Sequence, residues 1–126
     1  MIEIEWKMHN RIAYIMVSGT SDSVSIQNVD TELERVMNLA TQAVHLIVDI
    51  HLMDQFPSLN NIIRSPYLRH MRRGWIVVIG LSEKPLFRIL VNSFVNGLRS
   101  SARYADSLAE ALALLQTLDS TLPGEA

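Results

Sequence analysis

The 126-residue sequence contains no cysteine, which excludes disulfide bonds, thiolate chemistry and metal sites built on cysteine. It contains only five glycines, and none of them creates the spacing of a phosphate-cradling loop. The four histidines lack the spacing of metal ligands, so we expect neither a metal nor another cofactor. A chain without cysteine is compatible with the cytosol, and we expect a cytoplasmic location.

Long hydrophobic runs are also missing. The longest is Trp75–Leu81, far too short to cross a bilayer, so we expect no membrane span. The composition, 48% apolar and 19% charged, is typical of a globular domain. The length suits one domain with a substantial core. We therefore expect a single domain over residues 1–118 and a frayed tail over residues 119–126.

Charge is unevenly distributed along the chain. The segment from Arg64 to Arg103 holds eight of the eleven basic residues and one acid, Glu83, so it carries +7 while the remainder carries −9. Four arginines form the densest basic patch: Arg64, Arg69, Arg72 and Arg73. Such a patch can steer an anionic partner, pair copies of the chain, or simply be a solvated surface. Because only Tyr67 interleaves the patch and the pI is near 6.0, we do not expect nucleic-acid binding.

Hydrophobic periodicity predicts the order of the elements. The apolar run Leu46–Val48, ended by Asp49, is too short for a helix and too apolar for a half-exposed strand, so it predicts a strand buried on both faces. Upstream, the alternating pattern of Ile2–Met8 and the apolar segment Ile12–Val17 predict a hairpin with an edge strand. Further strands are expected at 75–80 and 100–104, and helices at 58–64, 83–96 and 108–118. A first helix is expected after a cap at Ser23 or Ser25, with its apolar stripe over residues 29–40. Ser107 and Glu110 form a capping box at the start of the last helix.

This order predicts an α/β fold with a two-layer architecture. With right-handed crossovers, strands two to five form the parallel part of a five-stranded mixed sheet, and the first strand adds antiparallel at one edge. We expect consecutive strands to be neighbours, with about four helices mainly on one face of the sheet.

The helix expected at 83–96 is more apolar than a helix lying on a sheet requires. Apolar residues cover about two-thirds of its circumference. Either neighbouring helices cover the excess, or this helix is an interface between two copies of the chain. The candidate dimer residues are Leu86, Phe87, Leu90, Val91, Phe94 and Val95.

Several chain segments together resemble the STAS domains (sulfate transporter and anti-sigma-factor antagonist) and, more distantly, the CRAL-TRIO lipid-binding core. These segments are Val44–Ile50, Phe56–Leu59, Gly74–Gly80 and Tyr104–Leu112. The resemblance implies a STAS-like βα superhelix and a regulatory or signalling module, like an anti-sigma-factor antagonist, that is not an enzyme.

The resemblance also suggests a phosphorylation site. Anti-sigma-factor antagonists carry an Asp-Ser-Ser-Gly pattern at the start of the helix after the third strand, and Ser58 occupies the matching helix start. Pro57, Leu59 and Asn60 depart from the rest of that pattern. Ser58 is therefore a candidate phosphoacceptor or helix-start anion site, with simple helix capping as the alternative.

Loops after parallel strands carry most α/β binding sites. The candidate ligand or partner loop comprises Asp49, His51, Asp54, Phe56 and Ser82. Our main hypothesis is a non-enzymatic interaction module whose partner is another protein or a second copy of the chain. The alternative is a small-ligand or lipid-binding domain whose pocket, at the C-terminal ends of the parallel strands, includes Phe56, Leu81 and Phe87.

An enzyme is the third possibility. Asp49, His51, Asp54 and Ser58 can be imagined to converge as a triad, which requires a positioned nucleophile, a base and an oxyanion site. The sequence lacks the Gly-x-Ser-x-Gly elbow that strains a nucleophilic serine into position. We therefore assign no catalytic residues.

Overall fold

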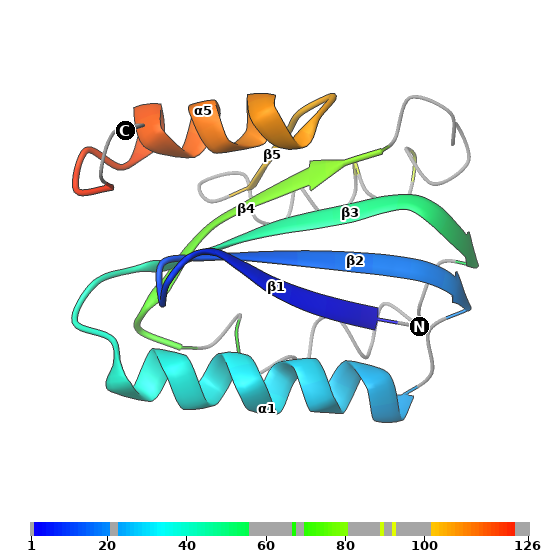
Figure 1. The fold of residues 1–126 in the computed structure, drawn as a ribbon, viewed down its shortest axis with the longest axis horizontal. Helices are drawn as coiled ribbons and strands as arrows, with labels where there is room; N and C mark the ends of the chain where they lie inside the picture. The colour runs from blue at the N-terminus through cyan, green and yellow to red at the C-terminus, as the bar shows by residue number, and fades with distance from the viewer. Residues whose placement is uncertain are drawn as a thin grey trace.

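The computed structural model describes residues 2–20, 23–55, 67, 70–80, 89, 92 and 102–122. Its strands form one five-stranded sheet in the order β1-β2-β3-β4-β5 (Figure 1). The β1–β2 pair is antiparallel and the three other pairs are parallel, as the sequence predicted. The elements are β1 (Ile2–Met8), β2 (Ile12–Thr20), α1 (Ser23–Leu39), β3 (Val44–Gln55), β4 (Arg73–Ile79), β5 (Ala102–Tyr104) and α5 (Leu108–Leu118).

The β1–β2 hairpin turns through residues that tolerate a left-handed backbone. Asn10 has a φ of 57°, a conformation that asparagine accepts more readily than most residues. The N–H of Arg11 donates to the carbonyl oxygen of Met8 at 3.0 Å and closes the turn. The hairpin therefore forms where the sequence predicted it, and β1 is the edge strand.

The central strand β3 is buried on both faces. Leu46 and Ile50 point to one side and join a core with residues of α1, whereas Ile47, fully buried, joins a second core with residues of α5. Neighbouring β2 and β4 alternate in the same way, with Ile15 on the first side and Val77 on the second. A parallel strand with apolar side chains on both faces requires cover on both.

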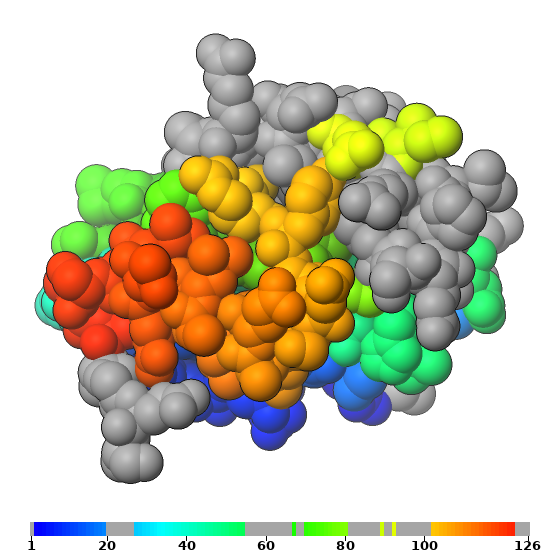
Figure 2. All heavy atoms as spheres, turned by 90° about the horizontal axis from the view of Figure 1, so that it is seen from above, coloured from blue at the N-terminus to red at the C-terminus, as the bar shows by residue number. Residues whose placement is uncertain are grey.

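The two described helices supply that cover from opposite sides (Figure 1). Helix α1 packs Leu33 and Met37 against one face, and α5 packs Ala111 and Leu115 against the other. Figure 2 views the second face: α5 crosses it, and parts of β1 remain visible beside the helix. The expected two-layer arrangement with helices mainly on one face is therefore wrong for the described helices, because the strands are apolar on both faces.

Two of the four expected helices fall largely outside the described residues. These are the helices at 58–64 and 83–96, although Tyr67, Ile89 and Asn92 have helical conformation. Neither α1 nor α5 is long and apolar enough to span a membrane.

The N-terminal end of β3 is tied to the end of α5 through a buried histidine. His45 accepts the N–H of Trp75 at Nδ1 (2.8 Å), so its Nε2 carries the proton and donates to Oδ2 of Asp119 (2.8 Å). The Arg11 guanidinium pairs with the same carboxylate oxygen at 2.9 Å.

Leu122 is 7% exposed and belongs to the core under α5. The tail expected to fray from Asp119 is thus packed through Leu122, while residues 123–126 lie outside the described residues.

Asp119 makes stability depend on pH. Burial of its carboxyl group opposes ionisation, but hydrogen bonds from Thr121 and His45 outweigh that effect and lower its pKa from 3.8 to about 2. A depressed carboxyl pKa stabilises the folded state above the unfolded-state pKa, and the contribution disappears as the pH falls from about 4 to about 2. We expect Asp119→Asn to reduce the free energy of unfolding by about 1–2 kcal/mol at pH 7.

Urea denaturation of both proteins between pH 2 and pH 7 checks this prediction. The difference between wild type and variant should shrink on acidification. Glu34→Gln, which changes an exposed carboxylate on α1, is the control and should leave stability unchanged at all pH values. A difference that stays constant with pH would contradict the assignment to Asp119.

Candidate functional site

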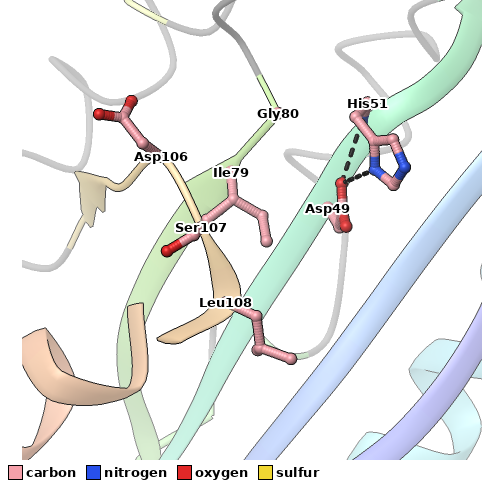
Figure 3. Close-up of a pocket in the computed structure, with 7 residues that line it drawn as sticks. All are labelled: Asp49, His51, Ile79, Gly80, Asp106, Ser107 and Leu108. Atoms are coloured by element: carbon pink, nitrogen blue, oxygen red, sulfur yellow. Dashed lines mark hydrogen bonds and ion pairs between the residues drawn. The ribbon is translucent and has the colours of Figure 1, made fainter. Parts of the chain in front are cut away.

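A pocket of about 250 Å³ lies beside Asp49 and His51 of β3, where β4 ends and α5 begins (Figure 3). The C-terminal edge of parallel strands is the usual place for an α/β binding site. The residues that line the pocket are Asp49, His51, Ile79, Gly80, Asp106, Ser107 and Leu108.

A β-bulge shapes the β3 side of this pocket. Met16 of β2 is opposite Asp49, but Ser18 is opposite Leu52, so β3 contains one more residue than β2 over this stretch. Bulges re-aim side chains at the ends of strands. Here the N–H of His51 turns back and donates to Oδ1 of Asp49 at 3.0 Å, so the aspartate side chain closes a local turn.

Gly80 allows β4 to end against this bulge. Its φ is 90°, a conformation that side-chain-bearing residues rarely adopt. A Cβ atom at this position would lie 2.5 Å from the backbone nitrogen of His51. Both facts require glycine, because any side chain here would push β4 away from β3.

The carboxylate of Asp49 is the electrostatic centre of the pocket. It is 4% exposed; its Oδ2 accepts the hydroxyl of Tyr14, and its Oδ1 lies 2.5 Å from Nδ1 of His51. Burial opposes ionisation of Asp49, but the hydrogen bonds from Tyr14 and His51 outweigh it and lower its pKa below 3.8. Burial, and then the bond to Asp49, raise the pKa of Tyr14 to about 12. At neutral pH the aspartate is therefore ionised and the tyrosine is a neutral donor.

These charge states fix the tautomer of His51. An ionised carboxylate only accepts hydrogen bonds, so Nδ1 of His51 carries a proton. When the ring is neutral, its Nε2 is an acceptor, and the side chain is 49% exposed. Figure 3 shows that the ring meets Asp49 through Nδ1, with the second nitrogen on the far side of the ring. The pair thus resembles the base and orienting acid of a hydrolytic site.

The start of α5 forms the opposite wall. The hydroxyl oxygen of Ser107 accepts the N–H of Glu110 at 3.1 Å, which confirms the predicted cap. Figure 3 shows the Ser107 hydroxyl and the Asp106 carboxylate directed away from Asp49. Ser107 therefore caps a helix and is not positioned as a nucleophile for His51.

The structure tests the sequence-predicted residues unevenly. It brings Asp49 and His51 together in the pocket, whereas Asp54 is exposed and does not line it. Arg72 and Arg73 lie at the opposite, N-terminal end of β4. The other candidates lie outside the described residues: Phe56, Ser58, Arg64, Arg69, Ser82, Leu86, Phe87, Leu90, Val91, Phe94 and Val95.

Sequence reasoning missed part of the pocket. It did not assign Tyr14 or Asp106 to the site, and it treated Gly80 and Ser107 only as element boundaries. The signal for Gly80 and Ser107 was present, because both follow parallel strands and all such strands end at the same edge of the sheet. Tyr14 gave no such signal, since its contact with Asp49 depends on the register of β2 against β3.

Metal chemistry finds no support in the described part of the chain. No group of three or more histidine and carboxylate side chains there could hold a metal ion.

No protein-family model and no curated protein matches the sequence. The STAS-like resemblance therefore stays a prediction carried by the sequence patterns.

We predict that neutral His51 carries its proton on Nδ1, whereas His45 and His70 carry theirs on Nε2. His70 accepts the N–H of Arg72 at Nδ1 (3.0 Å) and pairs with Asn38 through Nε2 (2.8 Å), so it is a built-in reference. Long-range ¹H–¹⁵N spectra distinguish the two tautomers. Removing the acceptor with Asp49→Ala should abolish the Nδ1–H preference of His51 and leave His70 unchanged.

The companion variant Tyr14→Phe should reduce the free energy of unfolding by about 1–3 kcal/mol, because it removes a hydrogen bond to a buried charge. An Nε2–H signal for His51 in the wild-type protein would contradict the geometry described above.

Proposed function

We propose that this chain is a non-enzymatic, STAS-like regulatory module that acts through protein contacts. Support comes first from the strand order, because an antiparallel edge strand followed by four parallel strands is the arrangement that the resemblance implies. The site gives the second support. Asp49 orients the ring of His51 as an aspartate orients a catalytic base, but the hydroxyl of Ser107 in the same pocket caps α5 and is not placed as a nucleophile.

Regulation in this proposal takes place at the C-terminal edge of the sheet. The resemblance puts the phosphoacceptor at Ser58, in the chain segment that follows β3. Upstream in the same strand, Asp49 and His51 bond to each other and fix the local turn at the bulge of β3. Phosphorylation there would add about two negative charges beside an edge that already carries Asp49 and Asp54.

The proposed module is a homodimer that pairs through residues 83–96. Ile89, a described residue of that segment, is 66% exposed. Large apolar side chains at this exposure are well suited to an interface when neighbouring residues are apolar too. The opposite charges of segment 64–103 and the rest of the chain would further favour the pairing of two copies.

Ile89→Glu tests the dimer. Each copy contributes one Ile89, and burying an isoleucine side chain is worth about 1.5–3 kcal/mol, so we expect the variant to raise the dimer dissociation constant by about a hundred- to ten-thousandfold. Sedimentation equilibrium measures this constant directly. Leu39→Glu is the matched control, because Leu39 is 75% exposed at the end of α1 and should not affect the dimer. A wild-type monomer at high micromolar concentration would disprove the dimer.

The second candidate function is small-ligand binding, and the observation that favours it is the pocket itself. It lies at the C-terminal ends of the parallel strands, where the sequence led us to expect a ligand site. Its lining differs from the expected one, because Phe56, Leu81 and Phe87 lie outside the described residues.

Native mass spectrometry after gentle purification tests this candidate. We expect the native spectrum to show an additional mass from a bound ligand, and this mass should disappear when the protein is denatured. Leu108→Trp places a large side chain at the pocket wall and should remove that mass, whereas Leu39→Trp, at an exposed site on α1, should retain it. A mass retained in the Leu108 variant would place the ligand elsewhere.

A further inference from the structure

The buried carboxylate of Asp49 has an acceptor position that the described chain does not use. A carboxylate offers about four lone-pair positions. Oδ1 accepts from the backbone and the ring of His51, and Oδ2 accepts from the Tyr14 hydroxyl. Within the described residues these are the donors recorded for Asp49. One position on Oδ2 is left, on a side chain that is 6% exposed and lines the pocket.

The charge of the lining selects the kind of group that can fill this position. Among the residues that the structure describes, the pocket lining includes two carboxylates, Asp49 and Asp106, and no lysine or arginine. An anion would be repelled by this lining, whereas a cation that donates a hydrogen bond would be attracted. The depressed pKa of Asp49 keeps its carboxylate ionised throughout the neutral range.

Shape and polarity limit the ligand further. Ile79 and Leu108 give the pocket an apolar part, and Figure 3 shows both side chains between the β3 pair and the start of α5. At about 250 Å³ the pocket is smaller than the 300–1,000 Å³ or so that is common for drug-sized ligands. The ligand is therefore small, with a short apolar portion.

We propose that this pocket binds a small organic amine in its protonated form. The ammonium group donates to Oδ2 of Asp49, and the alkyl portion packs against Ile79 and Leu108. The exposed Asp106, whose carboxylate points away from Asp49, adds only a weaker, solvent-screened attraction. This inference rests on the ligand-binding candidate and names its ligand class. It does not depend on dimer formation through residues 83–96.

The test is a titration of the ¹⁵N-labelled protein with three probes of equal carbon number: n-butylammonium, 1-butanol and butyrate. We expect n-butylammonium to shift the amide signals of His51, Gly80 and Leu108 in a saturable way. Butanol should bind more weakly, and butyrate should not shift these signals. Butyrate binding as tightly as n-butylammonium, or shifts that never saturate, would overturn the proposal.

Two charge-removing variants localise the effect. Asp106→Asn should weaken n-butylammonium binding about two- to fivefold, as expected for a partly solvated charge pair. Asp54→Asn is the control, because Asp54 is an exposed carboxylate of the same strand as Asp49 but does not line the pocket. Equal weakening by both variants would show a general charge effect and overturn the assigned site.

The amine titration and the dimer measurement fail independently. If the protein dimerises through Ile89 but does not bind n-butylammonium, only the amine site is refuted. A monomeric protein with saturable amine binding refutes the dimer and retains the site.

Discussion

Burial of β3 on both faces is the constraint on which the rest of the structure depends. Leu46 and Ile47 point in opposite directions, yet both are almost completely excluded from solvent. Neither face then accepts an unpaired polar group, so α1 and α5 must cover one face each. The buried polar side chains described in β3 are His45 at its start and Asp49 near its middle, and each is hydrogen-bonded.

The two ends of β3 repeat one arrangement with opposite tautomers. His45 at the start and His51 near the other end each bond to an aspartate, the first through Nε2–H and the second through Nδ1–H. A glycine of the neighbouring strand lies against each histidine: Gly74 against the first and Gly80 against the second. A side chain at either glycine would collide with β3. The glycines therefore let β3 and β4 approach closely at the points where the polar groups lie.

Much of the fold could be predicted from the sequence, because burial leaves a direct periodic signal. The apolar run Leu46–Val48 located the central strand, and the Ser107–Glu110 pattern located the start of α5. Contacts between distant segments leave no such signal. The bonds from Tyr14 to Asp49 and from His45 to Asp119 depend on sheet register and helix placement, so the composition of the pocket and the packing of Leu122 were missed. The two described helices lie on opposite faces, which the sequence did not predict, because strand patterns reveal that a face is buried, not which element covers it.

The Arg11–Asp119 ion pair has a consequence for how this chain acquires its structure. It joins residues 108 positions apart, and it can form only after the hairpin, β3 and α5 have come together. Closing so long a loop has an entropic cost that local contacts must first offset. During synthesis the first strands therefore emerge long before their carboxylate partner, and this ion pair waits until the segment that carries Asp119 has left the ribosome.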